Sequence, residues 1–348
     1  MRSARAASLR LRVLCGLVCA TLWLGPWNSA AAAQHRVGGA AGLLLVANKG
    51  DRALGIIDPI KGKEIATVAE DGVTGHEIAA SPDGKLAFVP IYGNGGVGGR
   101  GTDGRLIRVI DLASRRIVGT IDFGNGVRPH CAVFGPNGLL YVTAELEDAV
   151  AVVDPNTLKI VGTIPTGQAE SHMLAISSDG KRGYTANVGA GTVSVLDLEA
   201  KKLVTVIPVC QVTQRISLSI DNRLAFTADQ RQPRLAVIDT ASDKVKTWIP
   251  LPGIGYGTRA TPDGKWLLVA MSRARKVGEV DLETMRLTRT LDVPRFPQEI
   301  LVRPDGAVAY VSCDASAKVA AIDLKGWKIE KLIDAGRNAD GLAWAPAP

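Results

Sequence analysis

The sequence lacks the short motifs by which many catalytic and nucleotide-binding sites are recognised. It contains no G-x-S-x-G nucleophile elbow, no H-E-x-x-H zinc motif, no C-x-x-C-H heme-attachment motif and no phosphate-binding P-loop. Aromatic residues make up only 5% of the chain and are not interleaved with basic residues, so no stacking platform for single-stranded nucleic acid is present. Beyond the N-terminus, no long stretch has the 3.6-residue hydrophobic period of a helix, so we expect little helix.

Cysteine is scarce, and the charge is nearly balanced once the N-terminal segment is set aside. Of five Cys, only Cys131, Cys210 and Cys313 lie beyond residue 33. An odd number at distant positions does not predict a disulfide framework, so we expect three small buried side chains. Removing the four Arg of residues 1–33 from 41 basic residues leaves 37 against 34 acidic ones. This small excess does not predict nucleic-acid binding.

Residues 1–33 have the composition of a signal peptide. Four Arg precede an apolar stretch at 13–25, which is too short to span a bilayer, and the small residues up to Ala33 suit a cleavage site. We therefore expect cleavage after Ala33 and export of residues 34–348 to the periplasm or the medium, with no membrane span after cleavage. The alternative is an uncleaved anchor.

One segment recurs along the rest of the chain. It occurs first at residues 76–84 (HEIAASPDG), and its first residue, here called the lead residue, recurs after 54 residues and then every 42. Each complete copy continues through a tight turn into three short runs rich in β-branched residues, which indicate strands. Four strands in a repeat of this length are typical of a β-propeller blade. The seven lead residues are His76, His130, His172, Gln214, Tyr256, Gln298 and Asp340.

Both ends of the repeat region carry an incomplete copy. Residues 43–49, 53–58 and 64–69 match the last three strands of a repeat, whereas 341–346 match a first strand. We therefore predict that residues 34–348 form an all-β, seven-bladed β-propeller of four-stranded antiparallel blades, the last blade closed by the N-terminal strands and the C-terminal strand. Such closure removes exposed sheet edges. The Asp that ends each third strand is interpreted as a turn residue that accepts backbone N–H groups.

The one longer spacing, between His76 and His130, comes from a glycine-rich insertion at residues 91–105. Seven of its fifteen residues are Gly, so we expect a loop rather than a strand. The insertion joins the second and third strands of its blade and therefore lies on the same face as the lead residues. We interpret it as a mobile flap near the channel mouth, the alternative being a solvated loop with no role.

The repeat resembles that of the YVTN-repeat β-propeller family. The resemblance rests on residues 141–144 (YVTA), 184–197 (YTANVGAGTVSVLD), 310–312 (YVS) and the turn at 81–84 (SPDG), and it covers nearly all of the chain after residue 33. More distantly, the chain is similar to the seven-bladed lactonase propellers and to the propeller domain of nitrous oxide reductase. The resemblance implies a secreted or periplasmic protein with a binding role, and it indicates an architecture rather than an activity.

All seven lead residues are polar, and each is predicted to lie just before an innermost strand. A residue there is free to turn into the mouth of the central channel, so the seven would form a polar ring. Arg128, close to His130 in the chain, is a candidate cation for an anionic ligand. Glu77, Arg215 and Glu299 share the next position of the repeat and are interpreted as inter-blade or rim contacts.

Three consecutive blades carry a His as lead residue, so His76, His130 and His172 are predicted to be neighbours. Three neutral imidazoles with an open fourth position suit Zn²⁺ or Cu. Asp340 would lie next to His76 after closure, as a further ligand or as the acceptor of an imidazole N–H. A hydrated polar channel or an organic ligand are the alternatives. Cys131 follows His130 directly, but strand alternation directs it between blades rather than towards a metal.

We therefore predict an exported, non-enzymatic propeller, expected to be a monomer, that binds a small molecule or a periplasmic protein at the polar channel mouth. One alternative is a metal-binding module that uses the three His. Another is an enzyme, either a lactonase-like hydrolase or an accessory of periplasmic quinone- or metal-dependent oxidation. For a lactonase, Asp340 would be the only carboxylate at the mouth able to act as a base.

Overall fold

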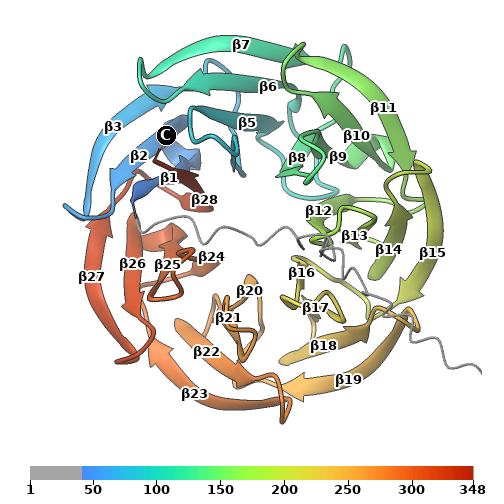
Figure 1. Cartoon of the computed structure of the whole chain (residues 1–348), viewed down its shortest axis with the longest axis vertical. Helices are drawn as coiled ribbons and strands as arrows, with labels where there is room; N and C mark the ends of the chain where they lie inside the picture. Colours follow the sequence, from blue (N-terminus) through green and yellow to red (C-terminus); the bar gives the residue numbers. More distant parts are fainter. Residues whose placement is uncertain (1–40, 348) are drawn as a thin grey trace, which may run out of the picture. The chain divides into compact units, whose positions relative to one another are not determined.

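The computed structural model describes residues 41–347, which form seven four-stranded antiparallel sheets arranged as the blades of a propeller (Figure 1). In six blades the strands follow one another along the chain from the innermost to the outermost. Blade 1 instead takes its innermost strand from the C-terminal end and its other three strands from the start of the described chain. The predicted all-β, seven-bladed propeller is therefore confirmed.

The strands are given from the axis outwards. Blades 1 and 2 contain β28 (Ala339–Pro346), β1 (Gly42–Asn48), β2 (Ala53–Asp58) and β3 (Lys63–Ala69), then β4 (Ala79–Ala80), β5 (Leu86–Gly93), β6 (Asp103–Asp111) and β7 (Arg116–Asp122). Blades 3 and 4 contain β8 (Pro129–Phe134), β9 (Leu140–Ala144), β10 (Ala149–Asp154) and β11 (Lys159–Pro165), then β12 (Ser171–Ile176), β13 (Arg182–Asn187), β14 (Thr192–Asp197) and β15 (Lys202–Pro208). Blades 5 and 6 contain β16 (Ser217–Leu218), β17 (Leu224–Ala228), β18 (Arg234–Asp239) and β19 (Lys244–Pro250), then β20 (Thr258–Ala260), β21 (Trp266–Met271), β22 (Lys276–Asp281) and β23 (Arg286–Asp292). Blade 7 contains β24 (Pro297–Val302), β25 (Val308–Cys313), β26 (Lys318–Asp323) and β27 (Lys328–Asp334).

The first and last strands of the described chain close the ring. β1 pairs with β28 in antiparallel fashion, with Gly42 opposite Pro346 and Val46 opposite Leu342. Each of the four strands predicted for this blade lies within two residues of an observed one. The predicted closure by N-terminal strands and a C-terminal strand is confirmed. It completes the ring, because β28 of blade 1 contacts β24 of blade 7 on one side and β4 of blade 2 on the other.

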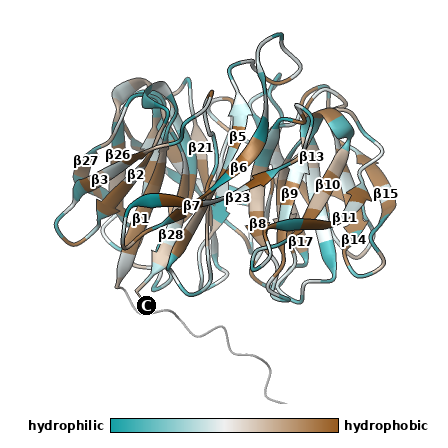
Figure 2. Ribbon diagram, turned by 90° about the horizontal axis from the view of Figure 1, so that it is seen from above, coloured by the Kyte–Doolittle hydropathy of each residue, from teal (hydrophilic) through white to brown (hydrophobic). Residues whose placement is uncertain are grey.

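Burial changes from the axis outwards in the way the sequence pattern requires. The third strands are nearly continuous apolar runs, such as AVAVVD in β10, because neighbouring blades cover both of their faces. The outermost strands expose most of their residues, as in β11. Figure 2 shows hydrophobic residues concentrated in the strands and hydrophilic ones at the turns.

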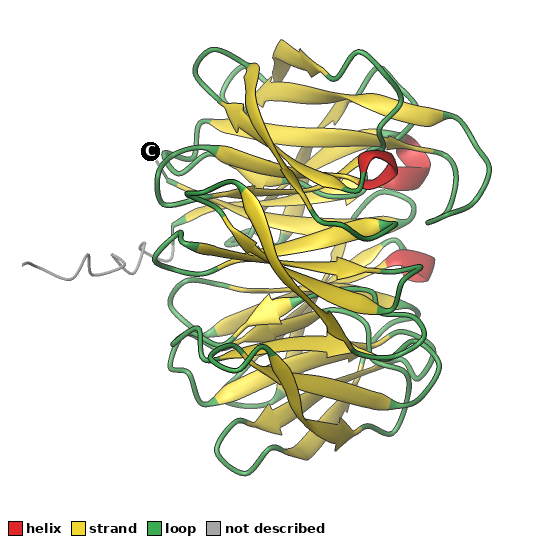
Figure 3. Ribbon diagram, turned by 90° about the vertical axis from the view of Figure 1, so that its right-hand side faces the viewer, coloured by secondary structure: helices red, strands yellow, loops and turns green. Residues whose placement is uncertain are grey.

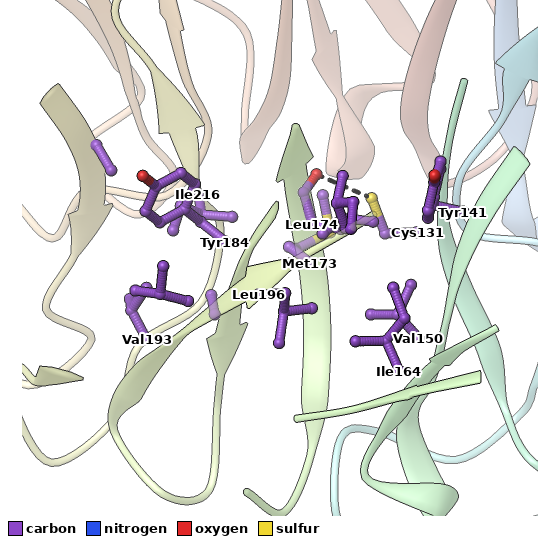
Figure 4. Close-up of a cluster of buried hydrophobic side chains, with 14 of the residues drawn as sticks. Cys131, Tyr141, Val150, Ile164, Met173, Leu174, Tyr184, Val193, Leu196 and Ile216 are labelled. Atoms are coloured by element: carbon purple, nitrogen blue, oxygen red, sulfur yellow. Dashed lines mark hydrogen bonds between the residues drawn. The ribbon is translucent and has the colours of Figure 1, made fainter. Parts of the chain in front are cut away.

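Apolar side chains between the sheets hold neighbouring blades together. In the largest cluster, Tyr141 and Val150 of blade 3 lie with Leu174 and Tyr184 of blade 4 (Figure 4). Each such side chain contributes about 1.5–3 kcal/mol on full burial, so this packing fixes the position of each blade relative to the next. The Cys131 thiol lies in the same cluster, 3.6 Å from the Leu174 carbonyl oxygen, between two blades as strand alternation predicts. The three cysteines within residues 41–347 are free, and of these Cys210 is only partly buried.

The glycine-rich insertion is a shorter loop than the sequence predicts. Ile91 pairs with Leu106 and Gly93 with Asp103, so β5 and β6 extend into residues 91–105, and the expectation that this whole segment is a loop was wrong. Ile91 and Tyr92 are fully buried, and this burial favours strand despite the glycines around them. The remaining residues, 94–102, are called the lid loop below.

The lid loop lies on the same face as three short helical turns. η1 (Lys49–Asp51), η2 (Glu145–Glu147) and η3 (Asp314–Ser316) occupy the connection between the second and third strands in blades 1, 3 and 7. Figure 3 shows these turns together on one side of the ring. The lid loop fills the same connection in blade 2, as predicted.

The Asp residues that end the third strands are turn residues. Asp58 Oδ1 accepts the backbone N–H groups of Ile60 and Lys61, each at 3.0 Å. The same pattern recurs at Asp111, Asp154, Asp197, Asp239, Asp281 and Asp323. The turn interpretation is therefore confirmed. No helix within residues 41–347 is long and apolar enough to cross a membrane, and the predicted signal peptide lies outside the described residues.

Candidate functional site

The lead residues stand at the start of the innermost strands. Four of them are the second residue of their strand rather than the residue before it, so the predicted position was wrong by two residues in blades 3, 4, 7 and 1. Strand pairing there continues past the lead residue across a local irregularity in register, for example between Ser171 and Met173. In blades 2, 5 and 6 the innermost strand is shorter and the lead residue precedes it, as predicted.

Three imidazoles lie together at this end of the channel. The ring centroids of His76 and His130 are 5.5 Å apart in an edge-to-face arrangement, and those of His130 and His172 are 3.6 Å apart and stacked. The Tyr92 ring lies 4.7 Å from His76, 5.0 Å from His130 and 5.8 Å from His172. The structure thus brings the three predicted His residues together, and it adds a Tyr that the sequence analysis had not singled out.

Glu145, the first residue of η2, anchors this imidazole cluster. Its carboxylate accepts the Tyr92 hydroxyl at 2.9 Å and lies 2.8 Å from His172 Nδ1. Burial alone would raise the pKa of Glu145, but the hydrogen bonds from His172 and Tyr92 outweigh it and lower that pKa. Since the ionised carboxylate can only accept, the proton lies on Nδ1 of His172.

The other two imidazoles are neutral. Burial lowers the pKa values of His76 and His130 well below the usual range of histidine. Only 2% of His130 is exposed, and its Nδ1 has no hydrogen-bond partner among residues 41–347. Buried ring nitrogens are normally paired, so the unpaired one of His130 is an exception that needs an explanation.

Arg128 ties the lid loop to this cluster. Its guanidinium donates to the carbonyl oxygens of Gly96 at 3.1 Å and Gly99 at 2.6 Å, and to the Asp103 carboxylate at 2.6 Å. The same group lies 3.6 Å from the Glu145 carboxylate and stacks over the Tyr92 ring. Arg128 is therefore buried and fully engaged, and it fastens the loop that the sequence analysis described as a mobile flap.

A second buried cluster crosses the channel itself. Arg215 of blade 5 lies 2.8 Å from Glu77 of blade 2 and 3.0 Å from Asp340 of blade 1, and it also contacts Glu299 of blade 7. These blades are not all neighbours, so the groups meet across the axis. The interpretation of Glu77, Arg215 and Glu299 as polar contacts between blades is confirmed, but the contacts also join blades that are not neighbours, because the side chains are long enough to span the channel. These four residues are called the channel ion cluster.

Two glycines make this reach across the channel feasible. Gly257 and Gly341 occupy the same repeat position as Arg215 and Glu299, in blades 6 and 1. A Cβ atom on Gly257 would lie 2.1 Å from the Gln298 carbonyl oxygen, and one on Gly341 would lie 2.7 Å from the Cα atom of Glu77. The neighbouring innermost strands therefore approach so closely that only Gly fits at these two positions.

The remaining lead residues belong to the ion cluster side of the mouth. Lys49 Nζ lies 2.9 Å from the Asp340 carboxylate, and the attraction of Lys49 and Arg215 lowers the pKa of Asp340 although burial opposes it. Gln214 donates to the Tyr256 hydroxyl at 2.8 Å, and the Tyr256 ring lies 5.2 Å from the Arg215 guanidinium. Gln298 is also buried here. Asp340 therefore has two cationic partners rather than a free carboxylate.

The imidazole cluster is not arranged as a metal site. Within residues 41–347, no group of three or more His, Cys, Asp and Glu side chains is placed to hold a metal ion. Stacked rings such as those of His130 and His172 cannot both direct a nitrogen at one ion, whereas three ligands of Zn²⁺ converge tetrahedrally. The predicted use of His76, His130, His172 and Asp340 as metal ligands would require the rings to reorient.

Comparison with known proteins identifies a family and a fold. Residues 134–345 match the family described as the cytochrome D1 heme domain. A solved structure of hydrazine synthase from Kuenenia stuttgartiensis aligns with a TM-score of 0.70 at 19% identity, over 82% of this chain and 93% of that chain. At this identity the likeness shows the fold alone. No curated protein matches the chain.

The family name implies a heme, so the fit of these residues to a heme was considered. A porphyrin needs a flat slot beside an axial ligand. Tyr92 packs against all three imidazoles, two of which stack on each other, and Arg215 crosses the channel, so no such slot lies between these groups. The family match also begins after His130 and so excludes most of the cluster. The residues present do not fit a heme at this site.

Proposed function

We propose that this chain, which belongs to the cytochrome D1 heme domain family, is an exported, non-enzymatic propeller that binds a small ligand at the imidazole cluster beneath the lid loop. The leader-like composition of residues 1–33 supports export to the periplasm or the medium. The segments at 141–144 (YVTA), 184–187 (YTAN) and 310–312 (YVS) support the YVTN-repeat type within the propellers. We expect the protein to act as a monomer.

The observation that carries this proposal is the unpaired Nδ1 of the buried His130. A buried polar group without a partner costs about 1–3 kcal/mol, and apolar residues at this position would avoid that cost. A ligand that hydrogen-bonds His130 removes it. The stacked and edge-to-face rings supply flat surfaces around the same point, so the ligand is held by shape as well as by a hydrogen bond.

The charges at the site favour an uncharged polar ligand. His76 and His130 are neutral because burial lowers their pKa values. The one carboxylate, Glu145, is already matched by Arg128 at 3.6 Å. A charged ligand would add an unmatched charge in a buried space, which is costly. Two neutral imidazoles and a carboxylate whose charge is matched by Arg128 instead suit a small molecule with hydroxyl or amide groups.

Catalysis is less well supported than binding. A lactonase-like hydrolase would need a free base at the mouth, and Asp340 is engaged with Lys49 and Arg215. Glu145, the nearest carboxylate to the imidazoles, has a lowered pKa and accepts hydrogen bonds from His172 and Tyr92. Neither is poised to take a proton from a substrate or from water near neutral pH.

One observation favours metal binding as a second candidate. His172 directs Nδ1 at Glu145, which leaves its other ring nitrogen as a donor to an ion, and metal-ligating His residues commonly have such a carboxylate partner. Zn²⁺ or Cu would then require His130 to swing away from His172. The structure shows no such arrangement, so this candidate depends on a change of ring orientation.

Native mass spectrometry of the untagged, exported protein tests both candidates. The mass under native conditions is compared with that of the denatured chain, and the measurement is repeated for His130→Ala and for a control, Val204→Ala, on the exposed wall of β15. A small organic mass that is lost in His130→Ala but kept in the control supports ligand binding. One equivalent of Zn or Cu supports the metal candidate. A wild-type protein with no bound mass, and no uptake of Zn²⁺ or Cu²⁺ on titration, overturns both.

A further inference from the structure

A second site lies at the other end of the innermost strands, between blades 6 and 7. A cleft of about 340 Å³ opens there, lined by the turn at 261–263, by Trp266, Leu268 and Glu279 of blade 6 and by the turns of blade 7. This volume suits a small organic ligand. The cleft shares no lining residue with the imidazole cluster, so it is independent of the proposed function.

Blade 6 departs from the repeat beside this cleft, and only there does a Leu at this position of the second strand, shared with Leu45 of blade 1, lie opposite a carboxylate. Leu268 lies opposite Glu279 in the sheet, and the equivalent pair in five other blades joins an aromatic residue to an aliphatic one. These pairs are Phe88–Val109, Tyr141–Val152, Tyr184–Val195, Phe226–Val237 and Tyr310–Ala321. The ring fills the space towards the next blade, as where Phe88 lies 5.4 Å from Phe134. Leu268 is too short to fill that space.

A buried carboxylate replaces an aliphatic residue at the same place. In all six other blades the residue equivalent to Glu279 is Ile, Val or Ala. The Glu279 side chain is only 3% exposed and pairs with Arg289, whose guanidinium lies 4.5 Å from the centre of the Trp327 ring in blade 7. Apolar packing residues would stabilise this inter-blade space at least as well as a buried ion pair. The fold's stability therefore does not account for the pair.

The repeat also shows what would fit the cleft. In blade 3 the Tyr141 ring occupies the equivalent space, and its hydroxyl accepts a hydrogen bond from Asn137 Nδ2 at 2.9 Å. Asn137 is the third residue of a turn whose counterpart in blade 6 places Asp263 at the edge of the cleft. A carboxylate there can accept a hydrogen bond from a hydroxyl group. Trp266, two residues before Leu268 on the same strand face, adds an aromatic wall.

We propose that this cleft binds a small phenol. The phenol ring occupies the space that Tyr141, Tyr184 and Tyr310 fill in their own blades, and the hydroxyl donates to Asp263. The Trp266 indole forms one side of the site. Blade 6 thus takes from solution the ring that five of the other blades supply from the chain.

Ligand-observed NMR on the protein without its leader tests this proposal with 4-methylphenol as the probe. Two compounds of similar size serve as controls: 4-methylcyclohexanol lacks the flat ring, and 4-methylanisole lacks the hydroxyl proton. Saturable binding of 4-methylphenol, at least about tenfold tighter than either control, is expected from the π-contact and the hydrogen bond. Absence of saturable binding, or equal affinity for all three compounds, overturns the proposal.

A substitution that restores the repeat provides the second arm. Leu268→Phe places an aromatic ring in the cleft, so 4-methylphenol affinity is expected to fall at least about tenfold while the melting temperature stays equal or rises. Val204→Phe, on the outermost strand of blade 4 where Val204 is 40% exposed, is the matched control and should leave affinity unchanged. Unchanged affinity in Leu268→Phe would place the ligand elsewhere and refute the site. If that variant does not fold, the comparison of the three probes on the wild type still decides.

Discussion

Replacing Arg215 by Met should destabilise the propeller strongly, because Arg215 holds together carboxylates from three other blades. Arg215 is fully buried and lies 2.8 Å from Glu77 and 3.0 Å from Asp340, and it also contacts Glu299. Methionine has a similar length, so the variant removes the charge without opening a large cavity. Removing one partner of a buried ion pair typically costs about 3–5 kcal/mol, since it leaves buried charge uncompensated.

The structure places the expected loss at the lower end of that range. Burial raises the pKa of Glu77 to about 8, so this carboxyl is mostly protonated at neutral pH and leaves little charge behind. Asp340 keeps Lys49 at 2.9 Å, whereas Glu299 keeps only the half-exposed Arg259 at 3.5 Å. The uncompensated charge is therefore mainly that of Glu299, and we expect a loss of about 3 kcal/mol, or a fall in Tm of about 5 °C.

Thermal and urea unfolding followed by circular dichroism measures this loss, with Arg223→Met as the control. The Arg223 side chain is 84% exposed and lies 3.8 Å from an exposed Asp221, so its loss should change stability by less than about 0.5 kcal/mol. The double variant Arg215→Met/Glu299→Gln should recover at least about 1 kcal/mol of the loss, because the stranded charge is gone. If Arg215→Met unfolds like the control, the channel ion cluster does not have the role described here.

Three further predictions concern neighbouring features of the mouth. Glu77→Gln should flatten the pH dependence of the free energy of unfolding between about pH 5 and 8. The folded-state pKa of Glu77 is raised from 4.5 to about 8, so the stability that its protonated form contributes is complete below about pH 4.5 and is lost as the pH rises through 8. Urea titrations at several pH values in which the free energy of unfolding changes equally with pH for both proteins would contradict this. Gly341→Ala should lower stability by about 1–3 kcal/mol because its Cβ would meet neighbouring backbone, whereas Gly96→Ala, with no atom within 4 Å of the added Cβ, should be neutral in the same unfolding assay. Arg128→Met removes three hydrogen bonds to the lid loop region, so trypsin should cleave after Arg100 at least about tenfold faster, as read by mass spectrometry of the fragments; an unchanged cleavage rate would show that Arg128 does not fasten the loop.

The blade architecture could be predicted because it repeats. A spacing of 42 residues between the later lead residues defined the modules, and the incomplete copies at 43–69 and 341–346 defined how the ring closes. The same periodicity placed His76, His130 and His172 in consecutive blades, which is why their proximity could be anticipated. Repeats encode relative positions well because each blade contacts its neighbours in the same way.

The charged groups that join the lead residues at the mouth were harder to predict because they come from another position of the repeat. Glu145, Lys49 and Asp314 each directly follow the second strand of their blade, and all three reach into the mouth. A charged residue at this position in four blades, with Asp229 of blade 5 as the fourth, was a signal that periodicity could have revealed. Tyr92 gave no such signal, because β5 extends further into the insertion than its glycine content indicated.

The crossing of the channel by Arg215 could not be derived from strand alternation alone. Alternation correctly places Cys131 between blades, but Arg215 and Glu299 have long side chains and a glycine in the next blade, Gly257 or Gly341. Whether a side chain ends at the next blade or reaches across the channel depends on its own length and on the size of the residue at the same position of the next blade. Pairing each position with its neighbour in the following blade would have indicated the difference.

NMR of the protein labelled with ¹⁵N-histidine tests most directly whether three imidazoles form one buried site. The account predicts nuclear Overhauser contacts between the rings of His130 and His172, and nitrogen shifts of His76 and His130 that remain those of neutral imidazole from pH 8 down to about pH 5, because burial lowers both pKa values. Imidazoles of His76 and His130 that titrate near the usual value of about 6.5, with no contacts between the rings of His130 and His172, would contradict it.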